Sequence, residues 1–310
     1  MAIVVLGTVF VDIKGFPNDA YSPTGRNAGW VEIVHGGVGR NVAEDIANIE
    51  LRPKLVSIVD DTATGAEVLS KLRDHKVNTD YVLTEPDGMG LWLAVFDNTG
   101  DLAGSISKRP EMDVLVQLLD EKGDEIFADA DSIVVEIDMD HEIIKRVFRY
   151  AKKYDKKVFA MVSNMTIAAQ RRDFLQSVDC FVCNQQEAGI LFVDDFSSMT
   201  PAELADELSD RISKANIPSM VVTMGSGGSV FASRGGEKGF QPSETVKVRD
   251  TTGAGDAFCA GVAAGLTYGK TLREAVRIGT LLAASVITIS ESTCPRFLPG
   301  ELGLDVEVAD

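Results

Sequence analysis

The chain of 310 residues is long enough for one large α/β domain or two small ones. Its composition, 45% hydrophobic and 25% charged, is typical of globular proteins and excludes wholesale disorder. The net charge of −17 would repel a phosphate backbone, so we expect no nucleic-acid partner. No apolar run approaches the roughly 18 residues that a membrane span needs, so we also expect no membrane association.

The N-terminal segment, residues 1–15, lacks the basic region of a signal peptide and is predicted to begin with a buried strand. The four cysteines are too few for a disulfide framework. We therefore expect a cytoplasmic protein in a reducing compartment.

Six short apolar runs without polar alternation are typical of strands buried on both faces of a sheet. They are Ile3–Leu6, Lys54–Val59, Ser132–Ile137, Lys157–Val162, Cys180–Cys183 and Met220–Met224. Segments with helical periodicity separate them, so the chain is predicted to adopt an α/β fold with a central, mostly parallel sheet and helices on both faces. No repeat or linker divides the chain, and residues 1–310 are expected to form a single domain.

Two segments, about residues 12–35 and 90–107, break this alternation. The first ends in Trp30–Val34 with a period of two, and the second is predicted to be a hairpin with its turn at Asp97–Gly100. We interpret the two segments as a small β-sheet lid over a cleft; two unrelated surface excursions are the alternative. Exposed strand edges on such a lid would allow two copies to form a homodimer.

The most informative motif is Asp250–Phe258, with the sequence DTTGAGDAF, between a β-like run at Thr245–Val248 and a helix of small residues. Gly253–Gly255 would lie at the helix N-terminus, where unpaired amides and the helix dipole bind anions. Asp256 would lie beside that anion, where a carboxylate can accept the proton of a hydroxyl that attacks phosphorus. The alternative is that Asp256 only complements the helix dipole. A glycine turn between two aspartates favours the catalytic interpretation.

A second glycine-rich stretch, Gly36–Asn41, joins the first lid segment to a helix. Its glycines would let the backbone approach a ligand closely, and Asn41 can donate to and accept from sugar hydroxyls. Val42 occupies the position of the third glycine in a dinucleotide fingerprint, which argues against a dinucleotide-dependent oxidoreductase.

These two stretches, in this order and about 210 residues apart, resemble the two signatures of the ribokinase-like (PfkB) carbohydrate and nucleoside kinases. The resemblance covers nearly the whole chain. It includes Asn184–Glu187, which is similar to the family's N-x-x-E motif, and Val222–Gly228, which is similar to its nucleotide-binding strand and turn.

The resemblance implies roles for individual residues. It makes Asp256 the catalytic base and the amides of Gly253, Ala254 and Gly255 the anion hole for the transferred phosphoryl group. The substrate would be bound by Asp12, Gly36, Gly37 and Asn41. The nucleotide would be bound by Asn184, Glu187, Thr223, Gly225 and Gly228, with Glu187 also arranging magnesium through water. Asp250 and Thr252 match positions that hold a monovalent cation in ribokinase relatives, with backbone carbonyls near residues 287–296 as further ligands.

The implied activity is a phosphotransferase that uses ATP and Mg2+ to phosphorylate a hydroxyl of a small-molecule sugar or nucleoside, with K+ left open. In motif detail, Gly36–Ala43 and Asp97–Gly100 are most similar to pseudouridine kinases. After Ile106 the chain has SKRP where those kinases tend to carry an Asn-Asp-Met-like run, so the substrate stays open. Lys108 and Arg109 in this run are expected to be solvated charges, with a phosphate contact as the alternative. The alternative function is a catalytically inactive sugar- or nucleoside-sensing protein on the same fold.

Overall fold

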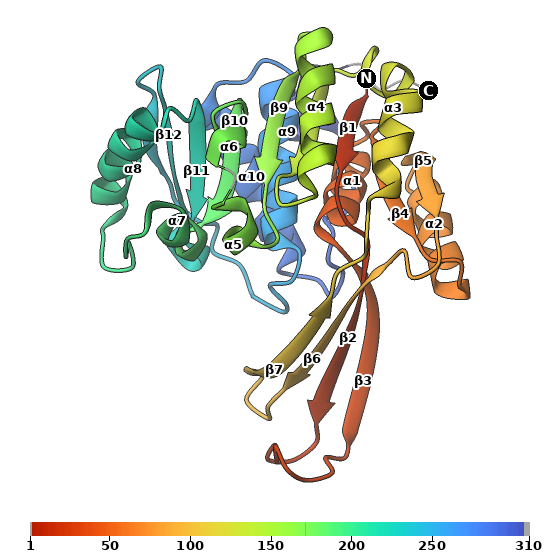
Figure 1. Ribbon diagram of the computed structural model, residues 1–310. Coiled ribbons are helices and arrows are strands. Elements are labelled where there is room, and N and C mark those ends of the chain that lie inside the picture. Colours follow the sequence, from red (N-terminus) through yellow and green to blue (C-terminus); the bar gives the residue numbers. More distant parts are fainter. Residues whose placement is uncertain (1, 171, 307–310) are drawn as a thin grey trace.

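The computed structural model describes residues 2–170 and 172–306, and within them the strands form two separate sheets (Figure 1). The larger sheet has nine strands. In spatial order they are β13 (Lys238–Gln241), β12 (Ser229–Ser233), β11 (Ser219–Thr223), β10 (Cys180–Asn184), β9 (Lys157–Met161), β8 (Ser132–Glu136), β1 (Ile3–Leu6), β4 (Lys54–Val59) and β5 (Asn78–Thr84).

Neighbouring strands are parallel from β5 to β11, and only β12 and β13 pair antiparallel at one edge. The six predicted apolar runs all form strands, with bounds within one residue of those expected. The prediction of a mostly parallel sheet is confirmed. The β-like run Thr245–Val248 is the exception, because it forms no strand; Val246 and Val248 are exposed and no neighbouring strand pairs with them.

Helices cover both faces of this sheet, and on each face the side chains of strands and helices pack into a hydrophobic core. One face holds α1 (Val38–Asn48), α2 (Ala63–Asp74), α9 (Ala254–Thr267) and α10 (Leu272–Val286). The other holds α3 (Val114–Phe127), α4 (His141–Lys153), α5 (Met165–Ala168), α6 (Arg172–Leu175), α7 (Gln185–Phe192) and α8 (Pro201–Ala215). Two short 3-10 helices, η1 (Gly225–Gly227) and η2 (Pro299–Leu302), complete the described helices.

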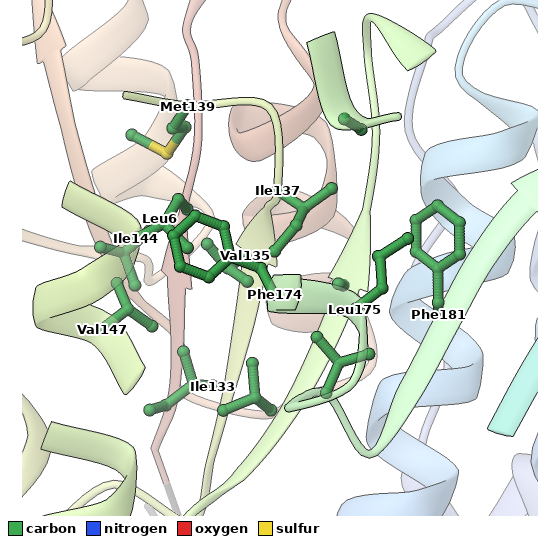
Figure 2. Close-up of a cluster of buried hydrophobic side chains, with 14 of the residues drawn as sticks. Leu6, Ile133, Val135, Ile137, Met139, Ile144, Val147, Phe174, Leu175 and Phe181 are labelled. Atoms are coloured by element: carbon green, nitrogen blue, oxygen red, sulfur yellow. The ribbon is translucent and has the colours of Figure 1, made fainter. Parts of the chain in front are cut away.

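The core beneath α3 to α8 shows how the sequence specifies the layers. Val135 of β8 packs with Ile144 and Val147 of α4 and with Phe174 of α6, all of them at most 8% exposed (Figure 2). Apolar side chains spaced three apart on α4 lie on one face of that helix and are buried together. None of the helices in the described ranges is both long and apolar enough to span a membrane.

The small sheet contains four strands in the order β3 (Gly29–Gly36), β2 (Phe10–Pro17), β6 (Gly90–Phe96) and β7 (Leu102–Lys108). It projects beyond the carboxyl ends of the parallel strands (Figure 1). Phe16 stacks between Trp30 and Phe96, with ring centroids 5.2 and 4.9 Å apart, and this stack stabilises strands that have no helix of their own.

The register of the small sheet gives its two faces different characters. One row across the four strands is Val34, Asp12, Trp92 and Ser107, and this row faces the space beside the large sheet. The next row is Ile33, Ile13, Leu93 and Ile106, of which Ile33, Leu93 and Ile106 are exposed. Alternation along each strand therefore gives an inner face that mixes polar and aromatic side chains and an outer face that is apolar.

Candidate active site

A cavity of about 400 Å³ lies between the small sheet and the carboxyl ends of β1 and β9. In open parallel sheets this edge is where ligands bind. The lining residues come from distant parts of the chain, from strands of the small sheet and from the loops and helices that follow strands of the large sheet. They are Thr8, Phe10, Asp12, Gly37, Val38, Asn41, Trp92, Ser107, Arg109, Ser163, Asn164, Thr252, Gly253 and Asp256.

Asp256 lies in the first turn of α9, as the motif predicted, and faces this cavity. Gly253 caps the helix in the left-handed conformation, with φ of 82°. A Cβ atom on Gly253 would lie 1.9 Å from the carbonyl oxygen of Ser292, so only glycine fits here. The first amides of the helix follow this turn: the Ala254 N–H donates to the Thr251 carbonyl at 3.3 Å, and the Gly255 N–H lies next to it in the first turn, where helix amides lack the partners of the helix interior. The sequence thus places a carboxylate beside the first amides of a helix, a position at which anions can bind.

The amide of Asn41 holds the Asp256 carboxylate. Asn41 Nδ2 donates to Asp256 Oδ2 at 2.7 Å, and this contact joins residues 215 positions apart. Burial raises the pKa of Asp256 from 3.8 to about 7; the hydrogen bond from Asn41 lowers it, and the nearby charges of Glu136 and Asp12 raise it. A carboxylate with such a pKa can accept a proton near neutral pH.

Arg40 orients that asparagine. Its side chain is buried, and Nη1 donates to Asn41 Oδ1 at 2.7 Å, which turns the NH2 group of Asn41 toward Asp256. The guanidinium also forms an ion pair with buried Glu44 one helical turn later, and Glu44 accepts the hydroxyl of Thr293 at 2.8 Å. Helix α1 thus supplies both the contact to Asp256 and the charged pair behind it. No sequence feature had singled out Arg40.

Asp12 lies on β2 and lines the same cavity. Burial raises its pKa to about 6, against the lowering effect of the Lys14 and Arg40 charges. The two glycines behind it have different roles. A Cβ on Gly36 would approach the Asp12 carboxylate to 2.7 Å, so Gly36 makes room for this side chain. Gly37, with φ of 97°, lines the cavity directly.

Two further acids, which sequence reasoning missed, lie at the end of β8. Glu136 is fully buried and accepts the backbone N–H of Thr8 at 2.7 Å; burial and the charge of Asp138 raise its pKa. Asp138 binds Arg109 at 2.6 Å. Sequence could have identified these two acids, because they follow a buried parallel strand at its carboxyl end, where ligand-binding sites form in such sheets.

The expectation that Lys108 and Arg109 are both solvated is correct for Lys108 alone. Lys108 pairs with Asp87 on the surface at 3.0 Å. Arg109 turns into the cavity, with its side chain 29% exposed, because the buried carboxylate of Asp138 holds its guanidinium there.

The residues assigned to the nucleotide lie further along the same edge of the sheet. Asn184 ends β10 and is paired in register with Thr223, which ends β11, and Gly225 and Gly228 form the following turn with φ of 55° and 89°. None of these residues lines the cavity around Asp256. The structure therefore places Asn184 and Thr223 side by side, away from Asp256.

Asn184 and Glu187 also form a capping box at the start of α7. Asn184 Oδ1 accepts the Glu187 N–H at 2.8 Å, and Glu187 Oε2 accepts the Asn184 N–H at 2.7 Å. The described contacts thus use one of the two carboxylate oxygens of Glu187. The other is a hard oxygen ligand of the kind that suits hydrated Mg2+. Among the described residues, no group of three or more His, Cys, Asp or Glu side chains could hold a metal ion.

Asp250 and Thr252, assigned to a monovalent cation, lie at the turn before Gly253, and Thr252 lines the cavity. Their side-chain oxygens both contact the ammonium group of Lys14, at 3.5 and 3.1 Å. The donor set therefore does not fit a free monovalent ion, because a charged group of the chain already occupies it.

Comparison with known proteins identifies the family of the chain. The model for the pfkB family of carbohydrate kinases matches residues 2–295. The chain is 34% identical to guanosine-inosine kinase from Exiguobacterium acetylicum, over 94% of this chain and 95% of that protein. It is 24% identical to pseudouridine kinase from Escherichia coli, over 89% and 87% of the two chains. The structure of Arabidopsis thaliana ribokinase complexed with ribose and ATP shares the fold, with a TM-score of 0.82 at 22% identity, covering 99% of this chain and 100% of that one. The chain therefore belongs to the pfkB family of carbohydrate kinases, phosphotransferases that act on a hydroxyl group, as its two glycine-rich stretches had predicted.

Proposed function

We propose that this chain phosphorylates the hydroxymethyl oxygen of a purine nucleoside such as guanosine or inosine, with ATP as donor and Asp256 as general base. The observation that supports this most directly is the Asp256 carboxylate at the N-terminus of α9, held by Asn41 at 2.7 Å and open to a cavity of about 400 Å³. The choice of a purine nucleoside rests on the 34% identity to a guanosine-inosine kinase, against 24% to a pseudouridine kinase.

The proposed transfer moves one proton and one phosphoryl group. The substrate hydroxyl gives its proton to the Asp256 carboxylate, and its oxygen forms a bond to the γ-phosphorus as the bond to the β-phosphate oxygen breaks. Negative charge on the transferred group faces the amides of Gly253, Ala254 and Gly255, where preorganised donors stabilise it. ADP carries away the bonding electron pair. The pKa of about 7 lets Asp256 be ionised before the reaction and protonated after it.

Polar groups around the cavity match the two parts of a nucleoside. Asp12 and Asn41 would bind the ribose hydroxyls, and Gly36 and Gly37 let the backbone approach the sugar. Trp92 faces the cavity from β6 and offers an aromatic surface for a base, while Arg109 offers guanidinium donors. A free sugar would leave the aromatic side chain without a partner, which favours a nucleoside.

The nucleotide would bind at the ends of β10 and β11, where Thr223, Gly225 and Gly228 leave the backbone accessible. Mg2+ bound to the phosphates neutralises charge on the transferring group. In this arrangement Asn184 fixes the orientation of Glu187 through the capping box, and the remaining carboxylate oxygen would accept hydrogen bonds from water bound to the metal.

An ADP-release assay over guanosine, inosine, pseudouridine, adenosine and ribose tests the substrate. We expect the highest kcat/KM for guanosine or inosine. A preference for pseudouridine or ribose would refute the purine assignment, and rates no higher than those of an Asp256→Ala control with every substrate would favour the sensing protein.

The two tryptophans of the chain offer a matched pair for the base contact. Replacing Trp92 by alanine should raise KM for a nucleoside by about tenfold or more, because base–aromatic stacking is worth about 1–3 kcal/mol, and should leave ribose unaffected. Trp30→Ala serves as control, since Trp30 is 52% exposed and stacks on Phe16 away from the cavity. Equal effects of both replacements would contradict a base contact at Trp92.

We also propose that two copies associate through the outer face of the small sheet. Ile33, Leu93 and Ile106 are 65%, 45% and 71% exposed; Leu93 and Ile106 are direct neighbours, and Ile13 joins them to Ile33 across the strands. Val31, on the same strand as Ile33, is also 65% exposed. Contiguous apolar surface of this kind marks interaction sites, and a second copy brings a complementary face. Sedimentation velocity should show a dimer that Ile106→Glu dissociates.

A control for that experiment is Val193→Glu, because Val193 is 82% exposed but lies at the end of α7. A wild-type monomer at micromolar concentration would refute the dimer.

A further inference from the structure

Lys14 places its ammonium group against the loop that leads into the anion-binding turn. Its Nζ lies 3.1 Å from Thr252 Oγ1 and 3.5 Å from Asp250 Oδ2, and its side chain is 6% exposed. The other carboxylate oxygen of Asp250 accepts the backbone N–H of Thr252 at 2.9 Å, which closes the loop into a tight turn. A nearly buried positive charge is therefore fixed beside residues 250–252.

The segment expected to complete a monovalent-cation site reaches the same place. The N–H of Arg249 donates to the carbonyl of Ile287 at 2.7 Å, and the carbonyl of Ser292 packs against Gly253. A cavity of about 240 Å³ lies here and is lined by Lys14, Asp250, Thr252 and residues 290–292, among others. Two further carboxylates line its walls. Glu67 lies 3.9 Å from the His35 ring, and Glu291 lies 3.2 Å from the Lys71 ammonium.

The positive charge of Lys14 offsets the negative charge of Asp250 near the first amides of α9. An uncompensated Asp250 carboxylate would oppose negative charge developing at the amides of 253–255, three residues further on. One oxygen of this carboxylate lies 3.5 Å from the Lys14 ammonium, and the other accepts the backbone N–H of Thr252 at 2.9 Å. A cation that contacts it restores a favourable potential for an anion.

We propose that the ammonium group of Lys14 replaces the monovalent cation, so that the chain positions its anion-binding turn without potassium. Lys14 is a positioning residue in this role, since it acts through Asp250 and Thr252. A lysine ammonium is a compact charge with three donors, and it repels a second cation from the same oxygens. The kinetic part of the test rests on the proposed kinase function; the binding part does not.

The experiment compares Lys14→Met with wild type while KCl replaces tetramethylammonium chloride at a constant ionic strength of about 0.1 M. Methionine keeps a flexible apolar stem and removes the charge. Lys108→Met is the matched control, because Lys108 is an exposed lysine of the same sheet. Both kcat/KM for the nucleoside and Tm without substrate are measured.

Wild type and Lys108→Met should change in kcat/KM by less than about twofold with K+ and keep a constant Tm. Lys14→Met should lose about tenfold or more without K+, as when a group that stabilises transition-state charge is removed. Added K+ or NH4+ should restore the rate and raise the Tm of this variant, because an ion that binds only the folded state stabilises it.

Saturable activation of wild type by K+, or a K+-dependent rise in its Tm, would overturn the proposal even if Lys14→Met failed to fold. Full activity of Lys14→Met without K+ would overturn it as well. A Lys14→Met variant that folds, loses activity and responds to no monovalent cation would assign Lys14 a purely structural role and would also refute it. The Tm measurement needs no substrate, so it decides the question even if no nucleoside is phosphorylated.

Discussion

Replacing Asp256 by asparagine tests the proposed base while keeping the shape of the site. Asn41 Nδ2 donates to Asp256 Oδ2 at 2.7 Å, and the amide oxygen of an asparagine can accept the same bond. Substrate and ATP affinity should therefore stay within several-fold of wild type. Turnover should fall by about 10²–10⁴, the contribution of a positioned general base. In wild type, kcat/KM should decline about tenfold per pH unit below about pH 7, because protonated Asp256 cannot accept a proton.

The same substitution should change stability in a pH-dependent way. Burial raises the folded-state pKa of Asp256 from 3.8 to about 7, so the folded protein binds more protons than the unfolded chain between these values. Stability from this group is therefore present below pH 3.8 and is lost as pH rises through 7. Asp256→Asn lacks this titration. Between about pH 5 and pH 8, the free energy of unfolding of wild type should therefore fall by about 2–3 kcal/mol more than that of Asp256→Asn, as expected for one carboxyl with these two pKa values.

Urea unfolding of both proteins at the two pH values measures that difference, and steady-state kinetics measure turnover. Near-wild-type turnover in a folded Asp256→Asn protein would refute the mechanism. A stability difference that does not change with pH would show that the carboxylate is not held in the poorly solvated setting described here.

Two further predictions concern the surroundings of Asp256. Gly253→Ala should destabilise the fold by about 1–3 kcal/mol, because alanine at φ of 82° is strained and its Cβ would meet the Ser292 carbonyl at 1.9 Å. The control Gly255→Ala, whose Cβ would meet nothing within 4 Å, should keep the stability of wild type. Equal urea midpoints for the two variants would contradict this prediction. Arg40→Met should lower the free energy of unfolding by about 1–3 kcal/mol, because the buried Glu44 carboxylate then loses its guanidinium partner and keeps the Lys71 ammonium at 3.7 Å and the Thr293 hydroxyl. A loss below about 1 kcal/mol would show that the Arg40–Glu44 ion pair is not needed for stability.

The sequence alone was sufficient for the framework of the fold and for the central motif. Uninterrupted apolar runs predicted six of the seven described parallel strands to within a residue, because a strand buried on both faces has a local signature. The seventh, β5 (Asn78–Thr84) at the edge of the sheet, has no such run and was not predicted. The position of Gly253–Gly255 at the helix N-terminus and of Asp256 in the first helical turn followed from the glycine turn itself. The pair Asn184 and Glu187 shows how a local pattern can serve two purposes, since it forms a capping box whatever else it binds.

Only the tertiary structure decided which side chains meet around that motif. Asn41 reaches Asp256 across 215 positions, Lys14 reaches Thr252 across 238, and Thr8 reaches Glu136 across 128. Such contacts depend on strand order, on register and on which face of a strand each residue occupies, none of which is encoded in a short window of sequence. Arg109 illustrates the same limit: its neighbours in sequence suggested a solvated charge, but the buried carboxylate of Asp138, in the turn after β8, holds its guanidinium in the cavity.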